Sequence, residues 1–177
     1  MNIALQYKDT LVHDRTEVCC PEFEISEWDY AQHDWNKKLF LQDSVPGLFY
    51  KPFPGPFRKA VARMQKISKE AKAIPNNGKA LVLTQSSSPF KSVLFMAVSK
   101  EVPGLKTTRL SGAFISRVFD GSNTAQSIRG LNGYLTSLGK MAKKYYFYHP
   151  YCSHCAKKHG HNYIVAIAET KTVDPYY

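Results

Sequence analysis

The sequence has few acidic residues and no long hydrophobic run. Its 177 residues contain 14 Asp and Glu against 24 Lys and Arg, which gives a formal net charge of +10. No apolar stretch approaches the roughly 20 residues that span a bilayer. Lys8 and Asp9 also interrupt the N-terminal segment, where a signal peptide needs an apolar core. We therefore expect a cytoplasmic protein with no membrane partner.

The excess of positive charge lies mainly in residues 58–72, in residues 140–144 and near Lys157, and it includes no Arg-rich tract and no nucleic-acid-binding motif. Net charge alone gives a basic protein only weak, salt-sensitive affinity for nucleic acid. We interpret the lysines as the solvated faces of helices, and we expect no specific DNA or RNA partner.

The common catalytic motifs are missing as well. The chain has no nucleotide-binding loop, no metalloprotease helix and no nucleophile elbow, and its three consecutive serines, 86–88, lack the Gly-x-Ser-x-Gly context. The acidic stretch that contains Trp28 and Trp35 pairs no carboxylates at a fixed spacing, so we interpret it as a solvated loop anchored by two aromatics. No catalytic constellation is evident, which leaves open whether the protein is an enzyme.

Cysteine is scarce, with four residues in the chain. In the cytosol this number favours metal binding or reduced thiols over disulfides. Cys152 and Cys155 lie in a predicted turn between two strands, a spacing that can present two thiolates to one metal ion. Cys19 and Cys20, far upstream, would complete a structural zinc site and fasten the N-terminal segment to the last hairpin.

Alternatives to this four-cysteine site remain open. Side chains of adjacent residues diverge, so His159 or His161 could replace one of the neighbouring cysteines as the fourth ligand. Thioredoxin-like redox chemistry needs a longer helix after the first cysteine than Gly160 allows. The thiols could also be incidental, with no metal bound.

A pattern of strand, helix and two strands occurs twice in the chain. In the first unit, residues 38–100, the helix of residues 56–74 has one apolar face, and Pro56 suits its first turn. In the second unit, residues 105–170, a cap at Ser122 or Asn123 starts the helix and Gly139 ends it. The strands are expected at residues 38–53, 80–84, 93–98, 109–119, 145–149 and 163–168, with loops at 85–90 and 152–160 and a further strand within 2–12.

This pattern predicts a single α+β domain over residues 1–177, with an N-terminal segment of residues 1–37. The two units most simply join edge to edge into one antiparallel sheet that carries both helices on one face. The opposite face would be concave, and a cleft between pseudo-symmetric units commonly holds a ligand.

The arrangement over residues 38–169 resembles the gyrase-inhibitor-like (GyrI-like) small-molecule-binding domain. The resemblance rests on the helix starts at Phe53-Pro54-Gly55-Pro56-Phe57 and Phe119-Asp120-Gly121. The whole chain also resembles a set of uncharacterised bacterial proteins with CCP near the N-terminus and CxxCAKK near the C-terminus. Here those motifs read Cys19-Cys20-Pro21 and Cys152-Ser-His-Cys155-Ala-Lys-Lys158.

The resemblance implies a stand-alone binding protein with a central aromatic pocket for an apolar, aromatic or cationic molecule. Strand alternation places Tyr146 and Tyr148 on one face, and we expect Tyr50 and Phe95 to line the same pocket. Many relatives carry a glutamate where Tyr146 stands, which argues here against a cation-binding carboxylate and against glutamate-based hydrolysis.

Two alternatives remain. One is a hydrolase of reactive small molecules on the same scaffold, for which Glu101, Asp120 and Glu169 are the remaining acidic candidates. The other is a zinc-stapled interaction module without a pocket.

Overall fold

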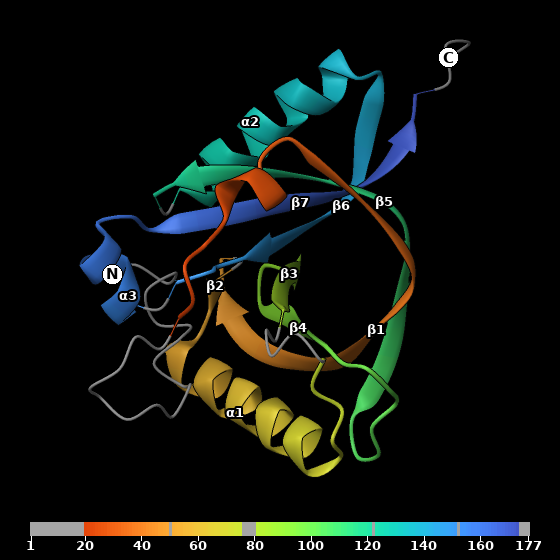
Figure 1. Cartoon of the computed structure of the whole chain (residues 1–177), viewed down its shortest axis with the longest axis vertical. Coiled ribbons are helices and arrows are strands. Elements are labelled where there is room, and N and C mark those ends of the chain that lie inside the picture. The colour runs from red at the N-terminus through yellow and green to blue at the C-terminus, as the bar shows by residue number, and fades with distance from the viewer. Residues whose placement is uncertain (1–19, 50, 76–80, 122, 152, 174–177) are drawn as a thin grey trace.

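The structure, a computed structural model, describes residues 20–49, 51–75, 81–121, 123–151 and 153–173 (Figure 1). The strand expected within residues 2–12 lies outside this part, as do Cys19, Tyr50 and Cys152. No helix in the described ranges combines the length and apolarity needed to cross a bilayer. The elements are η2 (Ile25–Glu27), β1 (Ala31–Leu48), β2 (Lys51–Pro52), α1 (Pro54–Glu70), β3 (Val82–Ser88), β4 (Lys91–Ala97), β5 (Lys106–Asp120), α2 (Thr124–Ser137), β6 (Lys140–Tyr148), α3 (Ser153–His159) and β7 (Tyr163–Thr172).

The strands form an antiparallel sheet that closes into a barrel. Among the described residues the strand order is β2-β1-β4-β3-β6-β7-β5, and a further pairing of β1 with β5 closes six of the seven strands into a ring. Strand β2 remains as a short edge beside β1. The α+β class and the antiparallel sheet are confirmed. The sequence pattern did not predict that this sheet closes, whereas here it curls round until its two ends meet.

Closure follows from the length and bending of β1. This 18-residue strand pairs with β5 from Ala31 to Gln42 and with β4 from Phe40 to Pro46, so it reaches both ends of the sheet. Its register with β5 shifts between Trp35 and Lys38. Such bulges bend a strand and increase its twist, which favours a closed sheet.

The helices α1 and α2 lie on the outside of the barrel (Figure 1). The apolar face of α1, with Phe57 and Met64, packs on Leu41 and Leu94, while Leu131 and Leu135 of α2 pack on β5 and β7. A third cluster, from alternate residues of the strands, fills the barrel interior. One sheet therefore separates an inner core from two outer cores.

Two local expectations fail for identifiable reasons. The expected loop over residues 85–90 is mostly strand, because β3 stays paired with β4 as far as Ser88, across a register shift after Ser86, and backbone pairing outweighs its polar side chains. The expected turn between the last two strands contains α3. Gly160, at a φ of +73°, ends that helix in the left-handed conformation that glycine favours.

Candidate functional site

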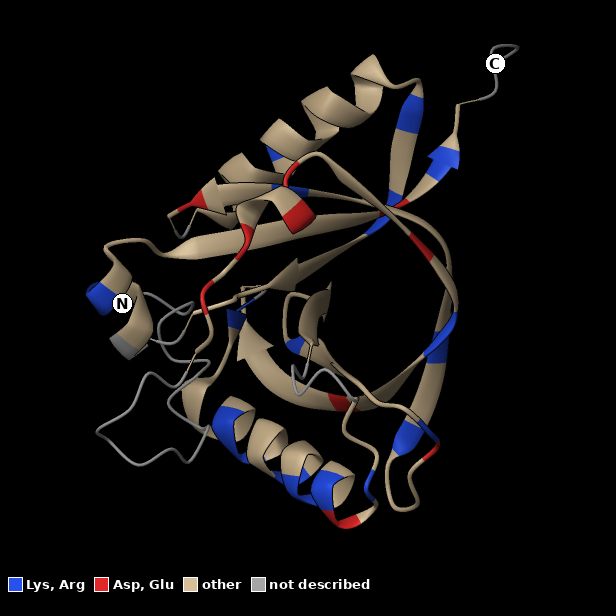
Figure 2. Cartoon of the chain, viewed as in Figure 1, with Lys and Arg blue, Asp and Glu red and all other residues tan. Residues whose placement is uncertain are grey.

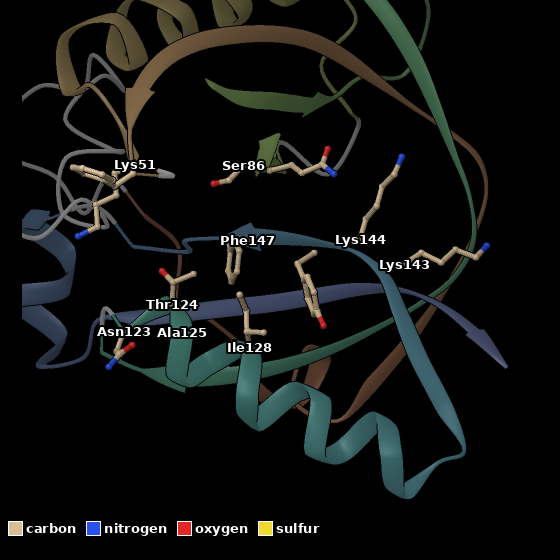
Figure 3. Close-up of a pocket in the computed structure, with 12 residues that line it drawn as sticks. Lys51, Ser86, Asn123, Thr124, Ala125, Ile128, Lys143, Lys144 and Phe147 are labelled. Carbon is tan, nitrogen blue, oxygen red and sulfur yellow. The ribbon is translucent and has the colours of Figure 1, made fainter. Parts of the chain in front are cut away.

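A cavity opens in the barrel wall where β3 and β6 separate. These strands pair only at Leu83–Tyr148 and Thr84–Phe147, after which β3 continues beside β4 alone. The first turn of α2 bounds the resulting gap (Figure 3). The cavity has a volume of about 830 Å³, within the range of sites for drug-sized molecules. Its lining residues are Phe49, Lys51, Gln85, Ser86, Asn123, Thr124, Ala125, Ile128, Lys143, Lys144, Tyr145 and Phe147.

One wall of the cavity is apolar and held in place. Phe147 from β6 is 9% exposed, and Ile128 from α2 packs against the same outer core. The hydroxyl of Tyr145 donates to Asn132 Oδ1 at 2.6 Å, which fixes the ring against α2. This wall offers an apolar, partly aromatic surface that does not need to rearrange before a ligand binds.

The remaining walls are polar and basic. The Asn123 side chain accepts a hydrogen bond from the Gln126 backbone at 3.1 Å, so a capped helix terminus lies at the cavity edge. Lys143 Nζ lies 3.7 Å from Glu169 Oε1. The described lining residues include no Asp, Glu or His. From the sequence we interpret the lysines of residues 140–144 as part of a solvated surface. No local pattern indicates that Lys143 and Lys144 line a cavity.

Three of the four predicted ligand-binding residues lie together in the barrel interior. Phe95, Tyr146 and Tyr148 belong to its cluster, with the Phe95 and Tyr146 ring centroids 5.6 Å apart in an edge-to-face contact. Burial raises the pKa of Tyr146 to about 12, and the nearby negative charge of Glu169 adds to the shift, so this phenol keeps its proton at neutral pH.

The cavity lies on the opposite face of β6 from this cluster. Tyr146 and Tyr148 point into the barrel, whereas their neighbours Tyr145 and Phe147 line the cavity. Strand alternation shows from the sequence which residues share a face. It cannot show which face borders an opening, because that depends on where β3 leaves β6. Tyr50 lies outside the described residues. That these four aromatic residues bind a ligand stays a prediction.

A serine and a histidine meet inside the barrel without forming a nucleophile and base. Ser116 Oγ donates its one hydrogen to the Trp28 carbonyl at 2.6 Å. His33 Nε2, 2.8 Å from the same oxygen, must therefore be the donor in the second bond. Burial, with a smaller contribution from Lys38, lowers the pKa of His33. Together the two bonds fasten Trp28 and the start of β1 to β5, and His33 is not placed to take the serine proton.

The acidic candidates are separated from one another. Glu101 pairs with Arg109 on the surface. Asp120 bonds His161 Nδ1 at 2.8 Å and the Asn162 amide at 2.9 Å, and the bond to His161 lowers the pKa of Asp120. Glu169 contacts Lys143, and through that lysine it adjoins the cavity.

Cys20 and Cys155 meet in a fourth cluster, where both are buried beside Tyr151. The candidate ligands differ in their surroundings, since the His159 ring stacks on Tyr151 with centroids 4.8 Å apart, while His161 bonds Asp120. In the described residues no three His, Cys, Asp or Glu side chains form a metal-binding group. Cys19 and Cys152 lie outside those residues, so the zinc site stays a prediction.

The fold and site define an α+β barrel with a lateral cavity. Residues 10–170 match the family described as Bacterial hydrolase, and the chain belongs to that family. Among solved structures it is similar to that of SAV2435 bound to tetraphenylphosphonium, with 10% identity and a TM-score of 0.44 over 84% of this chain and 98% of the other. A TM-score this low does not establish a shared fold. The comparison with curated proteins gave no match.

Proposed function

We propose that this protein binds a small molecule with an apolar or aromatic part in the cavity between β3, β6 and α2. The observation that carries the proposal is the cavity itself, whose volume of about 830 Å³ would accommodate a drug-sized molecule. Its walls combine an apolar surface of Ile128, Tyr145 and Phe147 with a few polar groups. Such a combination suits binding, in which apolar contact supplies affinity and polar groups supply orientation.

Two positions on α2 provide a matched test. Ala125 lines the cavity and is exposed, so Ala125→Trp would fill space without removing a core contact. Gln126 is also exposed but does not line the cavity, and Gln126→Trp adds the same side chain beside it. The compounds to compare are those that raise the melting temperature of the wild type in a thermal-shift screen of apolar and aromatic molecules.

The expected result is that Ala125→Trp abolishes the thermal shifts and the heat of binding in calorimetry, while Gln126→Trp retains both. Equal binding by both variants would place the ligand elsewhere. A screen in which no compound raises the melting temperature would count against small-molecule binding, because any ligand that prefers the native state must stabilise it.

The family description favours hydrolysis as a second candidate function. Hydrolysis needs a base or a nucleophile beside the bound molecule. Glu169, which contacts the cavity residue Lys143 and lies near Tyr146, is the acidic residue best placed for that role. Mass spectrometry of candidate compounds incubated with the protein would detect product. Turnover that survives Tyr146→Phe but is lost in Glu169→Gln would support a hydrolase, whereas binding without product supports a binding protein.

We retain the structural zinc clip as a separate proposal. It is supported by the packing of Cys20 and Cys155, one cysteine from each motif, in the same cluster. His159 suits the alternate ligand position better than His161, because its buried Nε2 has no hydrogen-bond partner among the described residues. A zinc ion held by four protein ligands would stabilise the fold and have no open position for catalysis.

A further inference from the structure

The cavity has an excess of positive charge. Lys51, Lys143 and Lys144 line it, and Figure 3 shows Lys51 and Lys144 on opposite sides. Glu169 offsets part of this charge through its contact with Lys143. Lys51 and Lys144 form no ion pair with any residue that the structure describes. Two ammonium groups are thus available to a ligand at the edge of an apolar surface.

The other polar groups of the cavity can also donate hydrogen bonds. Gln85 contributes an amide, Thr124 contributes a hydroxyl, and α2 begins at Thr124 on the cavity wall. The N-terminus of a helix carries a partial positive charge, which acts in the same direction as the lysines. A cation entering this cavity would meet like charge, and no lining carboxylate among the described residues would compensate for it.

We propose that the natural ligand is a small organic anion, with an apolar or aromatic body and a carboxylate, sulfonate or phosphate group. The body contacts Ile128, Tyr145 and Phe147, and the anionic group lies within reach of Lys51 or Lys144. This inference rests on the proposed function, since it specifies the charge of the molecule that the cavity binds.

A pair of probes that differ in little except charge tests the inference. Tetraphenylborate and tetraphenylphosphonium have nearly the same size, shape and apolar surface, but the first is an anion and the second a cation. Calorimetry on the whole chain at physiological salt, where long-range attraction is largely screened, compares their affinities. We expect the wild type to bind the borate at least tenfold more tightly than the phosphonium.

Substitution of the two lysines assigns this preference to the cavity. Lys51→Met and Lys144→Met keep most of the apolar stem and remove the charge. Each should weaken borate binding about fivefold, roughly the effect of removing one nearby opposite charge at a partly exposed site. The control is Lys69→Met on α1, an exposed lysine outside the cavity that lowers the net charge by the same amount. Basic residues are numerous along α1 as well (Figure 2). The control therefore shows whether an effect comes from the cavity lysines or from the net charge of the whole protein.

The outcomes separate the charge inference from the proposed function. Suppose that both probes bind to the wild type and that Ala125→Trp abolishes the binding of both. If the phosphonium then binds the wild type as tightly as the borate, the charge inference fails, but the cavity is still the binding site. An equal loss of borate affinity in Lys69→Met and Lys144→Met would also overturn it, because the protein's overall charge would then cause the preference. If neither probe binds, or if Ala125→Trp has no effect on either, the proposed function fails together with the inference.

Discussion

Replacing Ser116 by alanine tests the account of how the barrel is held closed at one end. Ser116 is completely buried, and its hydroxyl bonds the carbonyl of Trp28, just before β1, and the ring of His33, near the start of β1. Each bond contributes about 1 kcal/mol, and the buried partners left unpaired add to the loss. We expect Ser116→Ala to lower the free energy of unfolding by about 2–3 kcal/mol, which lowers the melting temperature by roughly 4–12 °C.

Ser92 is the matched control for this substitution. It is also buried, at 2% exposure, but its Oγ has no hydrogen-bond partner among the described residues. Ser92→Ala removes an unpaired buried hydroxyl, so the free energy of unfolding should stay the same or increase. Denaturant titration of both variants measures the difference. Equal losses, or a neutral Ser116→Ala, would show that these two hydrogen bonds do not hold the segment.

Three further predictions concern other parts of the molecule. Burial holds the pKa of His33 below 6.5 in the folded state, so the contribution of neutral His33 to stability should be fully present above about pH 6.5 and decline as the pH falls through that value. His33→Gln should therefore reduce the fall in melting temperature between pH 7 and pH 5. An unchanged pH profile in this variant would contradict the prediction. Gly47→Ala places a methyl carbon 2.8 Å from the Lys51 carbonyl carbon, so it should cost about 1–3 kcal/mol. Gly55→Ala in α1, where the added carbon meets nothing within 4 Å, should be neutral or stabilising, and thermal unfolding compares the two. Protein purified without a metal-binding tag should contain about one zinc ion per chain by elemental analysis, and Cys155→Ser should lower its melting temperature; four reactive thiols without metal would end the zinc proposal.

The local structure could be predicted where single residues determine it. Pro56 falls in the first turn of α1, Asn123 caps α2, and Gly139 follows α2 at a positive φ, as the sequence indicates. Each of these features depends on neighbours within a few residues. The class of fold is predictable for a similar reason, because apolar alternation marks most strands of the sheet.

Closure of the barrel could not be predicted in the same way. The first half of β1 contains charged residues around Trp35, and they hide the alternation that places His33 inside and Asp34 outside. Its pairing with β5 joins residues 64 to 85 positions apart, as at Gln42–Lys106 and Ala31–Ser116. Such pairing reflects the bend of the whole strand and leaves no local signal. The cavity was missed for the related reason that it depends on where β3 and β6 part.

The location of a bound ligand is the most direct test of the central claim. A crystal of the whole chain soaked with 6-bromo-2-naphthoate would reveal the bromine by its anomalous scattering. The account predicts a peak in the cavity, near Ile128 and Phe147 and within reach of Lys51 or Lys144. A peak inside the barrel among Phe95, Tyr146 and Tyr148, or no peak although binding is measured in solution, would contradict it.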